Sequence, residues 1–319
     1  PGALTPEDLW EKIATGADLI SEAPPGYWRT PPGLVMASPT NDSKDITWTD
    51  RGGYVRGFDS VFSPEDFFIP PEKILQYDPF IHWLLYSARA AINDAGYHKT
   101  NGLNAGVIIG NLSYPSPSFS RFAETYWMGE QKNSFFKKSV NRIATVDKPH
   151  AINRFMSGFP AHIVARALDL KNEAFCIDAA CASSLFAVKI ACDRLHDRKA
   201  DVMLAGGVNG SDDLIIHIGF CTLQAMSRTG QSRPFNQNAD GLVPAQGAGF
   251  VVLKRLEDAI LANDKIHGVI RAIGLSNDGR GRGLLVPSAD GQFKAMQKAY
   301  QMSGIQPSRV SLLECHATG

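Results

Sequence analysis

The apolar segments of the chain predict strands that alternate with helices. Short apolar runs bounded by glycine or polar residues predict buried strands at Ala105–Ile109, Ala174–Asp178, Val202–Gly206 and Phe250–Leu253. Apolar residues at helical spacing predict helices at about Asp78–Ala95, Ser183–Leu195 and Gln292–Met302. We expect further strands at Val269–Ile273 and Val310–Glu314. This alternation of strands and helices is typical of a layered α/β fold.

Capping signals mark where some of these helices begin and end. Thr5 followed by Pro6 predicts an early helix, with Thr5 as its N-cap. Asp78 is the predicted N-cap of the helix that Pro79 opens and Gly96 ends. The stretch Pro24–Asp50 is predicted to be an extended surface excursion, and residues 111–150 to be loops and short helices.

The composition is that of a soluble globular protein with room for a large core. The 319 residues are 44% hydrophobic and 20% charged, and Lys plus Arg equals Asp plus Glu at 32 each. This balance gives no field that favours nucleic acid or an acidic membrane, so neither is an expected partner. No run approaches the roughly 18 apolar residues of a membrane span, and the start has no signal-peptide pattern. Five scattered cysteines without CxxC pairs predict a reducing, cytoplasmic location.

Cys181 lies between an apolar strand and an apolar helix, in the segment Asp178–Leu185. At a strand-to-helix turn, unpaired amides and the positive end of the helix dipole favour the thiolate, the form that attacks carbonyls. The small neighbours Ala180 and Ala182 leave room for a substrate, and the Cys181 amide is placed to donate to an oxyanion. A buried structural cysteine is the commoner role for an arbitrary cysteine, but this context favours a nucleophile.

His316 follows the second predicted apolar strand and is a candidate general base or hydrogen-bond donor to an enolate. A lone histidine at such a place is more often an ordinary surface or core residue. The other histidines show no metal-ligand spacing, so we expect no metal site. The segment Gly279–Gly283 lacks the frame of a phosphate loop, and its arginines are candidates to hold a phosphopantetheine arm or a neighbouring domain.

The segment DAACASSL at 178–185 closely resembles the active-site motif D-T-A-C-S-S-S-L of β-ketoacyl synthases in polyketide and fatty-acid synthases. Other family motifs follow the same order along the whole chain. They include PPGYW, RGGYV, YDPF and INDAG in the first hundred residues, then AGGVN, SRPF, DG, GAG and SNDG. ECHATG at 314–319 is similar to the family segment E-A-H-G-T-G, which carries its first catalytic histidine.

The resemblance implies a thiolase-like fold, layered α-β-α-β-α, with its second half truncated here. Residues 1–260 would form the N-terminal half without its first strand, and residues 261–319 the start of the C-terminal half. It also implies a homodimer and a decarboxylative Claisen condensation. Cys181 would carry the acyl chain as a thioester, and His316 would assist decarboxylation of malonyl-carrier protein. No cofactor would be bound directly, because the acyl carrier protein supplies the phosphopantetheine with the acyl and malonyl thioesters.

The chain departs from the family pattern at a few positions. Gln246 replaces the glutamate of G-E-G-A-G, which removes a charge but keeps hydrogen-bonding reach. The lysine and second histidine of the family motif K-x-N-x-G-H are absent, so this fragment alone is expected not to complete the reaction. Because Cys181 is retained, the resemblance disfavours the chain-length-factor relatives that lack this cysteine.

Two other functions remain open at this point. One is a free-standing 3-oxoacyl-carrier-protein synthase of fatty-acid elongation, which would use the same chemistry. The other, from a different class, is an inactive scaffold that only docks carrier proteins; the presence of Cys181 and His316 speaks against it.

Overall fold

The computed structural model describes residues 2–28, 30–38, 45–98, 100, 102–130, 150–154, 157–280 and 286–318. The chain divides into two units, one formed by Pro1–Arg255 with Ala317–Gly319 and the other by Leu256–His316. The first unit contains α1 (Pro6–Thr15), α2 (Pro32–Val35), η1 (Phe58–Ser60), α3 (Pro71–Ile74), α4 (Pro79–Asp94), β1 (Ala105–Asn111), α5 (Pro117–Glu130), η2 (Ala151–Arg154), α7 (Phe159–Ala167), β2 (Ala174–Ile177), α8 (Ser183–His196), β3 (Val202–Asn209), α9 (Asp213–Thr222) and β4 (Gly247–Lys254).

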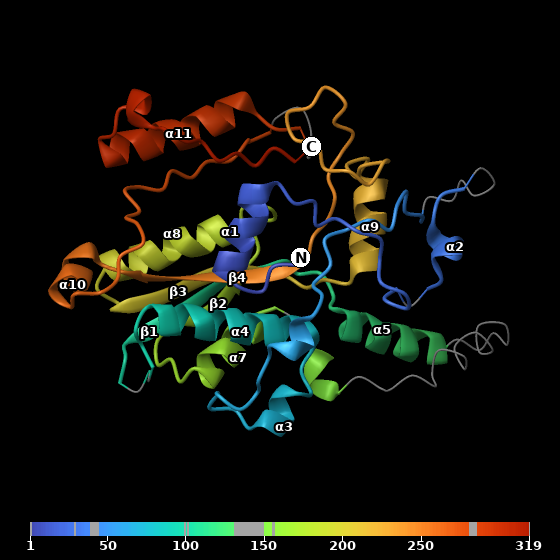
Figure 1. The fold of residues 1–319 in the computed structure, drawn as a ribbon, viewed down its shortest axis with the longest axis horizontal. Helices are drawn as coiled ribbons and strands as arrows, with labels where there is room; N and C mark the ends of the chain where they lie inside the picture. Colours follow the sequence, from blue (N-terminus) through green and yellow to red (C-terminus); the bar gives the residue numbers. More distant parts are fainter. Residues whose placement is uncertain are drawn as a thin grey trace. The chain divides into compact units, whose positions relative to one another are not determined.

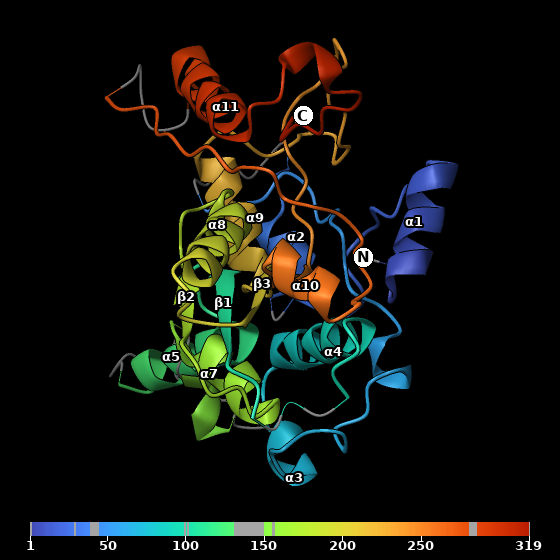
Figure 2. The same cartoon turned by 90° about the vertical axis from the view of Figure 1, so that its left-hand side faces the viewer.

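A four-stranded sheet in the order β2-β1-β3-β4 forms the centre of the first unit. β1 pairs in parallel with β2 and with β3, whereas β3 and β4 are antiparallel. Helix α8 covers one face of this sheet, and α4 and α7 cover the other (Figures 1 and 2). This arrangement confirms the predicted α/β layering and the four predicted strands of this unit.

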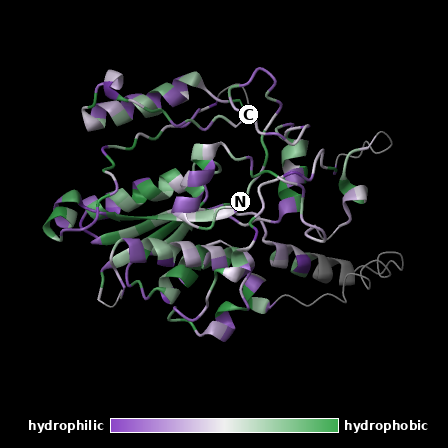
Figure 3. Cartoon of the chain, in the orientation of Figure 1, coloured by the Kyte–Doolittle hydropathy of each residue, from purple (hydrophilic) through white to green (hydrophobic). Residues whose placement is uncertain are grey.

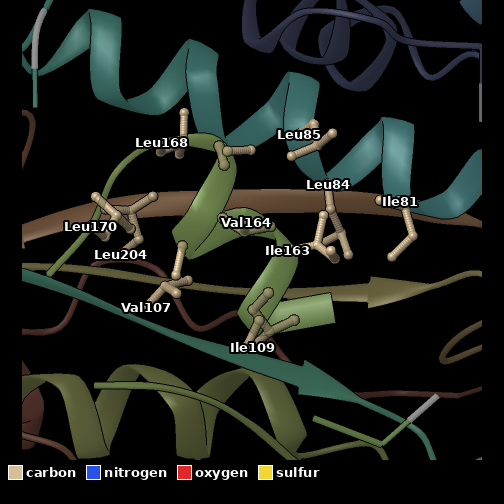
Figure 4. Packing of buried hydrophobic residues seen from close by; sticks show 14 of the residues in the cluster. Ile81, Leu84, Leu85, Val107, Ile109, Ile163, Val164, Leu168, Leu170 and Leu204 are labelled. Atoms are coloured by element: carbon tan, nitrogen blue, oxygen red, sulfur yellow. The ribbon is translucent and has the colours of Figure 1, made fainter. Parts of the chain in front are cut away.

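Coverage on both faces explains why the central strands are apolar throughout rather than alternating. Val107 and Ile109 of β1 pack toward α4 and α7, where Leu84 and Val164 are fully buried (Figure 4). Ile108, which points to the opposite face, packs with the α8 side. The ribbon coloured by hydropathy shows the strands as an apolar layer between the helices (Figure 3).

The α8 side of the sheet is packed with alanines and a few larger apolar residues. Ala187, Ala191 and Leu195 are buried at every fourth position of α8, against Met203 and Ala205 of β3. The small side chains of Ala187 and Ala191 let the helix axis approach the sheet closely. The helix that follows Cys181 is thereby packed against β3 of the central sheet.

The predicted helix ends are confirmed with one difference. Thr5 accepts a hydrogen bond from the Asp8 amide, and Gly16 ends α1 in the left-handed conformation. Asp78 lies at the N-cap position of α4, but its carboxylate makes no cap bond and instead accepts from the hydroxyls of Ser116 and Ser118. Burial raises the pKa of Asp78, and these hydroxyls act against that shift.

The segment predicted as a surface excursion, Pro24–Asp50, is partly buried. Trp28 and Thr47 are buried, and the backbone at Trp48 donates to the sulfur of Cys221 in α9. The prediction was wrong there because these side chains contact residues some 170 positions later, which local patterning does not reveal. The part of 111–150 predicted as short helices contains α5, and residues 131–149 lie outside the described residues.

The second unit contains α10 (Leu256–Leu261), α11 (Ala289–Ser303) and η3 (Pro307–Arg309). The predicted helix in 292–302 is confirmed by α11, which Ser288 caps through the Gly291 amide. The predicted strands Val269–Ile273 and Val310–Glu314 are not formed, and both stretches are irregular, without ladder pairing. A strand exists only when its amides and carbonyls pair with a neighbour, which an apolar pattern alone does not guarantee.

Candidate active site

Cys181 is an exposed cysteine in the short connection between β2 and α8. β2 pairs with β1 so that Gly110 lies opposite Ile177, the last residue of β2. The connection therefore begins at the carboxyl end of the parallel strands, where α/β folds place reacting groups. Helix α8 starts two residues after Cys181, so the helix N-terminus is adjacent to the thiol in sequence.

The connection is sharp because Ala180 adopts a left-handed conformation, with φ of 50°. This region costs an alanine about 1–2 kcal/mol relative to ordinary backbone. A residue kept there requires compensating contacts from its surroundings, and such strained residues tend to cluster at active sites.

Two side chains hold the backbone around Ala180. The Asp178 carboxylate accepts from the Ala180 amide at 3.0 Å and from the Ser113 amide at 2.9 Å. The Ser183 hydroxyl accepts from the Ala179 amide at 2.8 Å and donates to the Ala180 carbonyl at 2.6 Å. These backbone donors, Ser113 first, lower the pKa of Asp178, so its carboxylate is anionic at neutral pH.

Two glycines let the start of α8 lie directly on the sheet. A Cβ at Gly110 would be 2.6 Å from the backbone of Ser183 and Ser184, and one at Gly207 would be 3.0 Å from the Ser184 Cβ. Gly110 and Gly207 are register partners on β1 and β3. Only strands without side chains at this pair of positions allow the helix to begin where it does.

His316 belongs to the second unit, whereas Cys181 belongs to the first. His316 is exposed and follows an irregular segment rather than the predicted strand. The structure therefore places Cys181 in an ordered turn, and the joint role of Cys181 and His316 stays a prediction. The predicted loop arginine Arg282 lies outside the described residues, while Arg280 is exposed.

A buried polar cluster in the first unit was not predicted. The Asp213 carboxylate accepts from Trp28 Nε1 at 2.5 Å and from the Tyr54 hydroxyl at 3.2 Å, and it lies 3.3 Å from His217 Nδ1. The other ring nitrogen of His217 lies 3.2 Å from the Arg51 carbonyl. Both ring nitrogens thus face acceptors, which only the protonated imidazole satisfies.

Burial alone would lower the pKa of His217, but the Asp213 carboxylate and the carbonyl acceptors outweigh burial and raise it. Burial also raises the pKa of Tyr54, and the Asp213 charge adds to that effect, so Tyr54 stays protonated. The i,i+4 spacing of Asp213 and His217 within an apolar run was the sequence signal for this pair.

Gln246 uses both ends of its amide. Its oxygen accepts from the Val55 amide at 3.4 Å, and its nitrogen donates to the Tyr27 hydroxyl. Burial raises the pKa of Tyr27 to about 12. A glutamate carboxylate could accept from Val55 but could not donate to Tyr27, so this substitution changes the hydrogen-bond pattern as well as the charge.

Within the described part of the chain, no group of three or more His, Cys, Asp or Glu side chains could hold a metal ion. The described helices include none that is both long and apolar enough to cross a bilayer.

Two family models match the sequence. Residues 1–259 match the Beta-ketoacyl synthase, N-terminal domain, and residues 267–319 match the Beta-ketoacyl synthase, C-terminal domain. The chain belongs to the beta-ketoacyl synthase family. The resemblance predicted from the DAACASSL segment and the ordered motifs is confirmed.

Similar curated relatives include large polyketide synthases. The chain is 32% identical over 324 residues to a phenolphthiocerol/phthiocerol polyketide synthase of Mycobacterium tuberculosis, and it covers 16% of that protein. It is 31% identical to a mycocerosic acid synthase-like polyketide synthase of Mycolicibacterium smegmatis and covers 14% of it. In both cases the match extends over 100% of this chain. The chain therefore spans a small part of the length of these relatives.

Solved ketosynthase structures share the fold. The "PfaC Keto synthase-Chain length factor" structure matches with a TM-score of 0.89 and 34% identity, covering 100% of this chain and 35% of that one. The ketosynthase from module 6 of the bacillaene synthase of Bacillus subtilis matches with a TM-score of 0.77 and 27% identity, covering 100% and 49%. The mixed α/β fold of thiolase-like ketosynthases is thus confirmed for this chain.

Proposed function

We propose that this chain is the acyl-accepting part of a ketosynthase that extends polyketide or lipid chains by decarboxylative Claisen condensation. The observation that carries the proposal is the placement of Cys181. Its thiol is exposed at the carboxyl end of the parallel strands, after a strained residue and before the N-terminus of α8. Family membership supports the reaction class, an acyl transfer by a condensing enzyme.

In the first half-reaction, the Cys181 thiolate attacks the carbonyl carbon of an acyl thioester carried on the phosphopantetheine of a carrier protein. The tetrahedral oxyanion that forms is stabilised by backbone N–H groups, and the Cys181 amide just before α8 is the candidate donor. Collapse breaks the carbon–sulfur bond to the carrier and leaves the acyl group on Cys181, and the departing phosphopantetheine thiolate takes up a proton to become a thiol.

In the second half-reaction, malonyl-carrier protein loses carbon dioxide, and the electron pair of the broken bond forms an enolate. His316 is proposed to donate a hydrogen bond to that enolate oxygen. The enolate carbon then attacks the Cys181 thioester and expels the thiolate, which gives a β-ketoacyl chain two carbons longer. Because the family lysine and second histidine are not among these 319 residues, we expect acylation but no complete condensation by this chain alone.

The polyketide-synthase relatives favour a ketosynthase that works beside other domains over a free-standing elongation enzyme. The carrier domain, the thioesters and a homodimeric assembly are the partners that this proposal implies.

The test is labelling of Cys181 with a thiol-directed acyl analogue, followed by peptide mapping. Cys315 is the internal control, because it is also exposed but lies outside any strand-to-helix turn. We expect label at Cys181 well above label at Cys315, and loss of the specific label in Cys181→Ala. Unchanged labelling in Cys181→Ala would contradict the proposal and would leave the docking scaffold as the better explanation.

A further inference from the structure

Side chains hold both the amide and the carbonyl of Ala180, the residue that precedes Cys181. The Ala180 carbonyl, which belongs to the same peptide plane as the Cys181 amide, accepts from the Ser183 hydroxyl at 2.6 Å. The Ala180 amide, at the other end of the residue, donates to Asp178 at 3.0 Å. Both bonds constrain the one residue of the turn that has a positive φ.

Fixing the carbonyl of a peptide fixes its N–H, because the two groups are coplanar and point in opposite directions. The Ser183 hydroxyl, together with the Ser183 amide that donates to the same carbonyl at 3.1 Å, therefore sets the direction of the Cys181 amide. A donor to a tetrahedral oxyanion must be aimed before the reaction begins, since preorganisation is what makes it effective. Orientation of this amide is thus a function distinct from supplying the thiol.

Asp178 extends this support to a second element. Its other carboxylate oxygen accepts from the Ser113 amide at 2.9 Å, in the segment that follows β1. The left-handed turn is thereby tied to the neighbouring strand connection as well as to the beginning of α8.

We propose that Asp178 and Ser183 are positioning residues which fix the Ala180–Cys181 peptide plane so that the Cys181 amide is aimed at the oxyanion. Neither side chain touches the reacting atoms. This inference rests on the proposed function, because it requires that Cys181 reacts with an acyl carbonyl.

A comparison of two reactions of the Cys181 thiol distinguishes a positioning role of Asp178 and Ser183 from a purely structural role. Alkylation by iodoacetamide displaces iodide at carbon and forms no oxyanion, so it requires the thiolate but not the aimed amide. Acylation by a short acyl thioester of N-acetylcysteamine forms a tetrahedral oxyanion and requires both. Misorientation of the amide should slow acylation and leave alkylation nearly unchanged.

The experiment measures both rates at Cys181 in the full chain for Ser183→Ala, Asp178→Asn and the control Ser184→Ala. Asp178→Asn is nearly isosteric but replaces one acceptor oxygen with a donor, so one of the two amides loses its partner. Ser184 is exposed and lies next to Ser183 on the same helix turn. Ser184→Ala therefore removes the same chemical group as Ser183→Ala and serves as its matched control.

We expect Ser183→Ala and Asp178→Asn to slow acylation about 10- to 100-fold, below the loss seen when an oxyanion donor is removed outright. Alkylation should stay within about threefold, and Ser184→Ala should change neither rate. Parallel loss of both rates, or acylation equal to that of Ser184→Ala, would overturn the inference. Absence of any acylation in the unsubstituted chain, with alkylation intact, would instead contradict the proposed function.

Discussion

Gly110→Ala is the most direct test of how the sheet positions the nucleophile turn. The added methyl would meet Ser183 C and Ser184 N at 2.6 Å, both of them backbone atoms that no rotamer change can move. Contact becomes ordinary only at 3.4 Å, so the start of α8 must retreat by about 0.8 Å. Overpacking of this kind costs about 1–3 kcal/mol in a well-packed core.

The displacement should affect function more than stability. The first turn of α8 carries Ser183, and Cys181 is two residues away, so a shift of the helix start moves the thiol and its amide together. A misplacement of about 1 Å at a reacting group can lower a rate about 100-fold. We therefore expect acylation of Cys181 to fall by one to two orders of magnitude in Gly110→Ala.

Two measurements check this expectation. Urea unfolding followed by circular dichroism should show a midpoint lowered by roughly 0.3–1 M, if the slope is about 3 kcal/mol/M. Acylation by the thioester probe should fall as stated. Gly249→Ala is the matched control, because Gly249 lies on β4 of the same sheet and a Cβ there meets nothing within 4 Å. An unfolding midpoint and acylation rate in Gly110→Ala equal to those of Gly249→Ala would refute the reasoning.

Three further predictions concern the turn, the buried cluster and the core. Ala180→Gly should change the unfolding free energy by less than about 1 kcal/mol, because relief of the left-handed strain offsets the greater chain entropy of glycine; a loss above about 2 kcal/mol in urea unfolding would contradict this. The raised pKa of His217 means that its ion pair stabilises the fold fully below about pH 6.5 and less as pH rises through the folded pKa. The stability gap between the unsubstituted chain and His217→Gln should therefore shrink as pH rises above about 6.5, and a gap that widens would be inconsistent with a charged His217. Leu84→Ala, at a fully buried position of α4, should lower the free energy of unfolding by about 2–5 kcal/mol in the same measurement. A loss under about 1 kcal/mol would show that the surrounding side chains fill the cavity left by the leucine.

The strand-to-helix context of Cys181 could be predicted because it is local. An apolar run that ends in a small polar segment and continues as a helix specifies β2, the turn and α8 within about 20 consecutive residues. The conformation inside the turn could not be predicted, since alanine rarely adopts a positive φ and the residue types of Asp178–Ser183 do not indicate one. The contacts that hold Ala180 there appear only once the chain is folded.

Long-range pairing accounts for the other differences. The stretches Val269–Ile273 and Val310–Glu314 have the apolar character of strands. A strand also needs a neighbouring strand to pair with, and its own sequence does not specify which one. The cluster of Trp28, Asp213 and His217 joins residues about 185 positions apart. The i,i+4 pair of Asp213 and His217 could be recognised in the sequence, whereas the contact between Trp28 and Asp213 could not.

The energetics of the nucleophile turn predict how it responds to single and double changes. Asp178 and Ser183 together make four hydrogen bonds to the surrounding backbone, each with a net value of about 0.5–1.5 kcal/mol. Their sum exceeds the strain of about 1–2 kcal/mol at Ala180, so removal of one side chain should leave the left-handed turn populated.

Removal of both side chains should lower that population further. Asp178→Asn combined with Ser183→Ala leaves at most one of the four side-chain bonds, beside the backbone bonds from the Ala182 amide to the Ala179 carbonyl and from the Ser183 amide to the Ala180 carbonyl. We expect the double variant to lose more acylation activity than the product of the two single effects, because the turn then adopts ordinary backbone conformations more often. Adding Ala180→Gly, which removes the strain, should restore part of that loss. If the single effects simply multiply, and the glycine restores nothing, the two side chains act independently of the backbone conformation at Ala180.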